Sequence, residues 1–170
     1  MSKPNLNPTD PMSLRTLDET TLDALAIAWG PQHGINKGVS GSLRFDLIRD
    51  AHAVISNISP VCYLVSHGSS LIPNCLIQEI NANGGSVGAS GLTAAQIKEA
   101  VILGITKLNI GTDLSLAVTA TYRSYFNGDP SKYDPRDFTA SAKQYVYTVA
   151  VDAMRLLGSS NRGWAGIHDL

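Results

Sequence analysis

The sequence has few cysteines and little net charge, and both shortages narrow the class of protein. Its two cysteines, Cys62 and Cys75, form no CxxC pair, and Cys62 falls in a predicted buried strand, where a free thiol behaves as a small hydrophobic group. We therefore expect a reducing compartment and no structural disulfide. Charged residues make up 16% of the chain and the formal net charge is −1, without the basic runs typical of nucleic-acid binding.

Long apolar runs are also missing. No stretch approaches the roughly 18 apolar residues of a membrane span, and no signal peptide is visible. At 170 residues, the chain is long enough for one domain with a sizeable core. These bounds predict a cytoplasmic α/β protein that binds neither membrane nor nucleic acid.

The stretch from residue 61 to 113 gives the strongest pattern. Residues 61–66 and 107–110 are apolar runs without polar alternation, which predicts strands buried on both faces, as in a parallel sheet. Each run leads directly into a small polar turn, His67-Gly68-Ser69-Ser70 and Gly111-Thr112-Asp113. Polar residues at the carboxyl ends of such strands are where α/β proteins build their sites.

The rest of the chain alternates in the same way. A third strand is predicted over residues 24–29, and a helix start at Thr9-Asp10-Pro11. Helical spacing and stop signals predict helices over 43–55, 74–83, 93–103, 114–126 and 139–157, with 131–137 as a connector. Three βα units fit either a (β/α) barrel or a doubly wound sheet, but a closed TIM barrel takes eight strands.

Candidate chemistry lies in the turns. His33 and His67 follow two successive strands, and two histidines with a third ligand and an open position form a catalytic zinc site. A histidine at a strand end is more often a hydrogen-bonded or exposed residue than a metal ligand. The Gly68-Ser69-Ser70 turn presents N–H and hydroxyl groups that suit a phosphate, and the same residues also suit an ordinary turn. Asn109 needs hydrogen-bond partners at its strand end, for a structural or a catalytic reason.

Asp113, Asp129 and Asp134 fit local capping or turn roles. We therefore assign them no chemistry from the sequence.

Four segments together resemble the C-terminal part of class II, zinc-dependent fructose-bisphosphate aldolase, from about Thr9 to Ser160. They are Asp23-Ala24-Leu25-Ala26-Ile27-Ala28 with Gly30 and His33-Gly34; Val65-Ser66-His67-Gly68-Ser69-Ser70 with Pro73; Lys107-Leu108-Asn109-Ile110-Gly111-Thr112-Asp113; and Asp134-Pro135-Arg136. The resemblance implies a partial TIM (β/α)8 barrel that contributes the last three βα units and the C-terminal helices, over residues 9–160. Residues 1–8 would be a flexible N-terminus and 161–170 a polar tail.

The resemblance also implies an activity, the reversible aldol cleavage of fructose 1,6-bisphosphate to dihydroxyacetone phosphate and glyceraldehyde 3-phosphate in glycolysis and gluconeogenesis. Zn²⁺ would be held by His33 and His67, and Asn109 would stabilise the enediolate. The substrate phosphate would be held by the family's loop residues, Gly34, Gly68, Ser70, Gly111 and Thr112.

The family takes a proton-donating aspartate and a further zinc histidine from the first half of the barrel, and no segment here matches that half. Three alternatives follow: an aldolase that needs the N-terminal half, a non-catalytic phosphate-binding or scaffold remnant, and an aldolase for a tagatose-type bisphosphate. Gly111 stands where the fructose enzymes often carry an acidic residue, and Ala153 stands where some relatives place an arginine.

An exposed barrel edge would leave backbone groups unpaired, so we expect a homo-oligomer or a complementary N-terminal half-barrel chain as partner.

Overall fold

The computed structural model describes residues 22–31, 42–58, 62–88 and 90–163. These residues fall into two compact units, and each is described by itself. The sheet unit contains β1 (Ala24–Ala26), α2 (Phe45–Ile58), β2 (Tyr63–Ser66), β3 (Ile105–Leu108) and nearly all of α4 (Ala94–Ile102). The helical unit contains α3 (Asn74–Ala82), α5 (Thr112–Gly128) and α6 (Pro135–Leu156). The predicted helix start at Thr9 lies outside the described residues.

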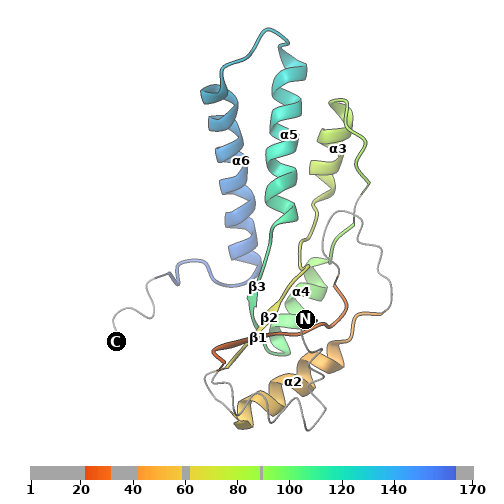
Figure 1. Ribbon diagram of the computed structural model, residues 1–170, viewed down its shortest axis with the longest axis vertical. Coiled ribbons are helices and arrows are strands. Elements are labelled where there is room, and N and C mark those ends of the chain that lie inside the picture. Colours follow the sequence, from red (N-terminus) through yellow and green to blue (C-terminus); the bar gives the residue numbers. More distant parts are fainter. Residues whose placement is uncertain (1–21, 32–41, 59–61, 89, 164–170) are drawn as a thin grey trace, which may run out of the picture. The chain divides into compact units, whose positions relative to one another are not determined.

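The three strands form one parallel sheet in the order β1-β2-β3, which Figure 1 shows as neighbouring arrows. The predicted α/β class with parallel strands is confirmed. The described residues form no closed barrel; they give three strands and the helices that accompany them.

Burial of the strands differs from the prediction of strands buried on both faces. Only Leu64, Val65 and Ser66 of β2 are buried in succession, whereas Tyr63 is 53% exposed. β1 and β3 each bury a single residue, Leu25 and Ile105, respectively. β2 is the middle strand and has a neighbour on each side, so its burial is the most complete.

Several predicted bounds were also wrong. β1 ends at Ala26, three residues early, and β3 begins at Ile105, so that Asn109 follows the strand. Cys62 precedes β2 and is half-buried. Burial, followed by the negative charge of Asp23, raises the pKa of its thiol.

The turn between α4 and β3 shows why α2 lies where it does. Gly104 has φ +127°, and a Cβ there would lie 2.2 Å from the imidazole of His52 on α2. A side chain at this position would face both a strained backbone and a clash. The missing side chain therefore lets α2 lie directly against this turn.

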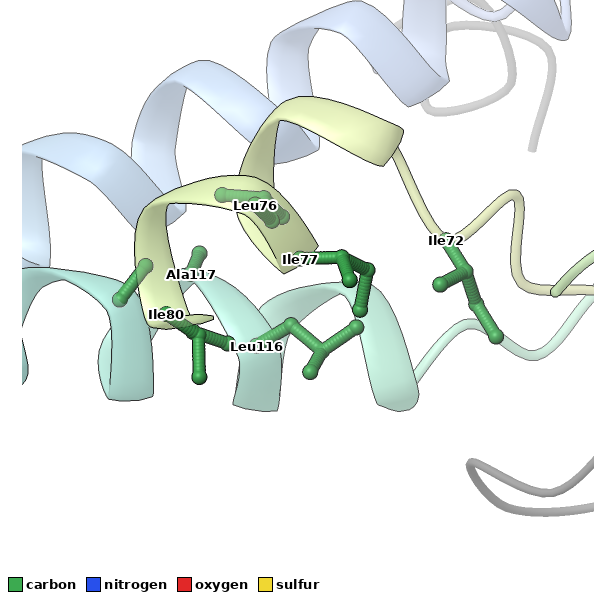
Figure 2. Packing of buried hydrophobic residues seen from close by; sticks show 7 residues of the cluster. Ile72, Leu76, Ile77, Ile80, Leu116 and Ala117 are labelled. Atoms are coloured by element: carbon green, nitrogen blue, oxygen red, sulfur yellow. The ribbon is translucent and has the colours of Figure 1, made fainter. Parts of the chain in front are cut away.

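The helical unit is built around one apolar cluster (Figure 2). Leu76, Ile77 and Ile80 of α3 meet Leu116 and Ala117 of α5, and α6 packs on α5 as the second arm of a helical hairpin (Figure 1). Spacings of three and four residues place these side chains on one face of each helix. The cluster holds the start of α3 and the start of α5 in a fixed relation within this unit.

α6 begins at Pro135, four residues earlier than predicted, so the expected connector is shorter. Asp134 caps the helix by accepting a hydrogen bond from the Arg136 N–H at 2.9 Å, and Pro135 occupies the first position, an arrangement that favours helix initiation. The predicted capping role of Asp134 is confirmed. Asp129 has the predicted turn role, because it accepts hydrogen bonds from the backbone and hydroxyl of Ser131. Among the described residues, no helix is long and apolar enough to cross a membrane.

Candidate active site

His67 and Asn109 are brought together by the pairing of β2 with β3. Ser66 lies opposite Leu108 in the parallel register, and the N–H of Asn109 donates to the Ser66 carbonyl at 3.0 Å. The next residues therefore emerge side by side. The amide nitrogen of Asn109 lies 3.2 Å from Nδ1 and 3.3 Å from Nε2 of His67, whose side chain is exposed. An amide at this distance can orient the imidazole by donating to one unprotonated ring nitrogen.

A buried polar network lies behind His67 in the sheet unit. The indole N–H of Trp29 donates to the Ser66 hydroxyl at 2.7 Å, and this hydroxyl lies 2.6 Å from the hydroxyl of Ser69. All three side chains are at most 1% exposed. Gly68, between these serines, has φ +69° and allows the chain to reverse. Since buried polar groups are costly when unpaired, this network fixes the shape of the turn.

A buried carboxylate fixes the continuation of the same turn within the helical unit. Asp113, 2% exposed, accepts hydrogen bonds from the Leu71 N–H at 3.0 Å and the Ile72 N–H at 2.7 Å. The prediction of a local capping or turn role for Asp113 is therefore wrong. Ile72 has φ +52°, a conformation that a β-branched residue rarely adopts. The two hydrogen bonds stabilise this strained backbone directly after Ser70.

The segment that contains Gly91 and Leu92 packs closely against the backbone of Ser70. Ser70 is 2% exposed, and its carbonyl accepts a hydrogen bond from the Leu92 N–H at 3.1 Å. A Cβ on Gly91 would lie 2.3 Å from the same carbonyl oxygen, which only glycine avoids. The backbone at Ser70 therefore has little room to shift.

Gly111 and Thr112 lie at the start of α5. Gly111 is the N-cap residue, offers no side-chain cap and is exposed, with nothing within 4 Å of the place where a Cβ would be. Thr112 is the first helical residue and carries a hydroxyl. Unpaired amide groups and the positive end of the helix dipole favour an anion at such a position. The arrangement has the chemistry that a phosphate requires.

The described residues do not by themselves make a metal site. His33 and Gly34 lie outside them, and the described part contains no group of three or more histidine, cysteine, aspartate or glutamate side chains arranged for a metal. His67 alone, with a neighbouring amide, is too small a donor set for zinc. Within the part of the chain that the structure describes, His67 and Asn109 are brought together and no second metal ligand joins them.

Sequence reasoning missed Trp29 and Ser66, placed Ser69 only in the candidate phosphate turn, and gave Asp113 a local role. The signals for Trp29, Ser66 and Asp113 were weak because each acts on a partner far along the chain, 37 residues away for Trp29 and Ser66 and 41 for Asp113 and Ile72. A serine at the end of an apolar strand and an aspartate in the first turn of a helix have common local explanations. Only the strand register and the tertiary fold reveal these pairs.

Comparison with known proteins identifies the family. The pattern of the family "Fructose-bisphosphate aldolase class-II" matches residues 7–162. The chain is 40% identical over 147 residues to a fructose-bisphosphate aldolase from Thermus caldophilus, covering 86% of this chain and 47% of that protein. It is 33% identical over 160 residues to the enzyme of that name from Giardia intestinalis, covering 93% and 48%.

A solved structure agrees on the fold. The structure, from Coccidioides immitis and assigned as a fructose-1,6-biphosphate aldolase, superposes with a TM-score of 0.61 at 16% identity and covers 91% of this chain and 44% of that one. The chain thus spans less than half the length of these relatives. It belongs to the class II fructose-bisphosphate aldolase family.

Proposed function

We propose that this chain forms the C-terminal part of a class II aldolase that cleaves fructose 1,6-bisphosphate reversibly to dihydroxyacetone phosphate and glyceraldehyde 3-phosphate, and that turnover needs the N-terminal half. The observation that carries the proposal is the family match over residues 7–162. It includes every turn in which the candidate site residues occur.

The chain's own part in this reaction is to bind and orient dihydroxyacetone phosphate. The loop residues Gly34, Gly68, Ser70, Gly111 and Thr112 hold its phosphate through N–H and hydroxyl groups, and the start of α5 supports this assignment. Asn109 donates a hydrogen bond to the enediolate oxygen, and its position beside His67 supports a shared role. Preorganised donors of this kind stabilise charge that develops during the reaction.

His33 and His67 are proposed as two ligands of a zinc ion, with at least one more ligand from outside the described residues. The family implies a metal ion; when bound, such an ion polarises the substrate carbonyl as a Lewis acid. The cytoplasm is the proposed compartment.

The two other functions remain as alternatives with an observation behind each. A phosphate-binding or scaffold remnant is favoured by Pro31 and Gln32, which stand where the family usually has a small polar pair before the zinc histidine. A tagatose-type bisphosphate is favoured by Gly111, which offers no carboxylate to the substrate hydroxyls.

Zinc content and aldol cleavage test the proposal together. We would measure both for the purified chain, alone and mixed with a separately expressed N-terminal half of the Thermus caldophilus aldolase. The proposal predicts chelator-sensitive cleavage in the mixture, and loss of that cleavage in His67→Ala. A mixture that forms a stable complex and binds zinc but cleaves neither bisphosphate would favour the remnant. Faster cleavage of tagatose 1,6-bisphosphate would favour the third function.

A further inference from the structure

One buried carboxylate joins the two turns of the helical unit that are proposed to hold phosphate. Asp113 is the second residue of α5 and directly follows the Gly111-Thr112 segment. Its oxygens accept hydrogen bonds from the N–H groups of Leu71, at 3.0 Å, and Ile72, at 2.7 Å. These two N–H groups belong to the residues that come immediately after Ser70. A single side chain therefore connects the Ser70 turn to the start of α5.

This connection depends on Asp113 alone in the part of the chain that the structure describes. Its two hydrogen bonds are the only ones there that join residues 70–73 to residues 110–113. The carbonyl of Ser70 accepts its hydrogen bond from the N–H of Leu92, away from α5. Asp113 therefore sets the distance from the Ser70 turn to the start of α5.

The backbone that Asp113 binds is strained and needs this support. Ile72 has φ +52°, a conformation that is unfavourable for a β-branched residue. If the carboxylate were lost, relaxation of Ile72 would turn the chain next to Ser70 and move the Ser70 hydroxyl. Hydrogen bonds weaken steeply when the donor leaves its alignment, so a phosphate bound by two turns requires a fixed distance between them.

The negative charge of Asp113 does not itself attract a phosphate. Two anions repel each other, and Asp113 is 2% exposed, so water screens its charge only weakly. Its two N–H partners and the positive end of the α5 dipole offset this charge. Any contribution of Asp113 to phosphate binding must therefore come from the position that it gives to the donors.

We propose that Asp113 is a positioning residue for the substrate phosphate, because it fixes the distance between the Ser70 hydroxyl and the donors at the start of α5. The inference rests on the proposed function, in which Ser70 and the Gly111-Thr112 segment hold the phosphate of dihydroxyacetone phosphate. Asp113 acts indirectly, through the backbone N–H groups of Leu71 and Ile72.

Calorimetric titration of the purified chain with dihydroxyacetone phosphate tests the proposal. We expect Asp113→Asn to weaken binding at least about fivefold, since an amide has one acceptor oxygen and turns its own N–H groups toward the second backbone N–H. Removal of a repelling charge alone would instead tighten binding. Asp137→Asn, in the exposed first turn of α6, is the matched control and should leave the affinity unchanged.

A double-mutant cycle with Ser70→Ala separates a positioning role from a general loss of stability. If Asp113 places the Ser70 hydroxyl, the cost of Ser70→Ala should be at least about tenfold in affinity in the unaltered protein. It should fall to about threefold or less in the Asp113→Asn background. A variant that is only less stable, but still folded, would keep the full cost of Ser70→Ala.

Three results would overturn the proposal while the proposed function stands: unchanged or tighter binding in Asp113→Asn, equal weakening in Asp137→Asn, or an undiminished cost of Ser70→Ala in the Asp113→Asn background. Absence of binding by the unaltered protein would overturn the proposed phosphate site and this inference with it.

Circular dichroism checks that each variant is folded. If Asp113→Asn is not folded, Asp113→Glu decides the result, because it keeps the charge and both acceptor oxygens but displaces them by one methylene. The positioning role predicts binding at least about threefold weaker in Asp113→Glu. Unchanged affinity in that variant would overturn the proposal.

Discussion

The sheet unit and the helical unit hold their parts of the turn after β2 by different chemistry. In the sheet unit, neutral groups do so: the indole of Trp29 and the hydroxyls of Ser66 and Ser69. In the helical unit, the carboxylate of Asp113 binds the N–H groups of Leu71 and Ile72. A charge accepts stronger hydrogen bonds than a hydroxyl and costs more when it loses them. The comparison therefore predicts that the hydrogen bonds of the Asp113 carboxylate contribute more to the free energy of unfolding than the network of Trp29, Ser66 and Ser69.

Asp113→Ala should have the largest effect. It leaves two N–H groups without their acceptor in a buried place and frees Ile72 to leave its strained backbone conformation, so we expect a loss of about 3 kcal/mol in the free energy of unfolding. Urea denaturation followed by circular dichroism measures it. Asp113→Asn keeps one acceptor oxygen and should lose about half as much. Little or no loss in Asp113→Asn would show that the carboxylate charge is unimportant.

Ser66→Ala should have the next largest effect. It removes the acceptor of the Trp29 N–H and the partner of Ser69, which should cost about 2 kcal/mol. Ser66→Thr, which keeps the hydroxyl, separates loss of the hydrogen bond from loss of volume, and Ser131→Ala serves as an exposed serine control. A loss as great as that of Asp113→Ala would contradict the difference between the two units.

Asp134→Ala should have a smaller effect, because the cap lies at the exposed start of α6. We expect the melting temperature to fall by about 2–4 °C, with Asp134→Asn closer to the unaltered protein. The Arg136 side chain, followed by its backbone N–H, holds the pKa of Asp134 below its ordinary value of 3.8.

The sign of the pH dependence follows from that shift. A carboxyl whose pKa is lower in the folded state contributes stability above its unfolded pKa and loses it as the pH falls through the folded pKa. The melting-temperature difference between Asp134→Ala and the unaltered protein should therefore persist at pH 7 and shrink on acidification below the ordinary value. A melting-temperature difference that grows as the pH falls would contradict the capping role of the ionised Asp134 carboxylate.

Arg155→Gln should have the smallest effect on stability. Its pair with Asp152 is exposed, and such pairs contribute less than about 1 kcal/mol and often nothing measurable. We expect a change within about 0.5 kcal/mol of the unaltered protein in the same urea experiment. A greater loss would mean that Arg155 holds α6 by a contact other than this ion pair.

The sequence predicts the parts of this molecule that depend on neighbours along the chain. Stop signals predict a helix end at residue 83, and α3 ends at Ala82, where the C-cap residue Asn83 is followed by Gly84 with φ +78°. The early start of α6 was also readable, because Asp134 followed by Pro135 is a strong helix-start signal. The prediction of a connector over residues 131–137 overlooks this signal.

Other features depend on tertiary contacts and were beyond local reasoning. The buried role of Asp113 and the strained Ile72 depend on each other across 41 residues. The His67–Asn109 contact was partly predictable, since both residues end neighbouring parallel strands, but its distance depends on a register that shifts between Leu64 and Val65. The exposed faces of β1 and β3 differ from the prediction because a run of apolar residues does not reveal what covers it.

Binding of dihydroxyacetone phosphate tests the central claim most directly. Calorimetry of the purified chain, with dihydroxyacetone as the uncharged comparison, would measure whether the family's substrate half is recognised through its phosphate. The account predicts binding of the phosphate ester only, with at least about tenfold loss in Ser70→Ala, since a hydrogen bond to a charged group is at stake. Equal affinity for both compounds, or full affinity in Ser70→Ala, would contradict it.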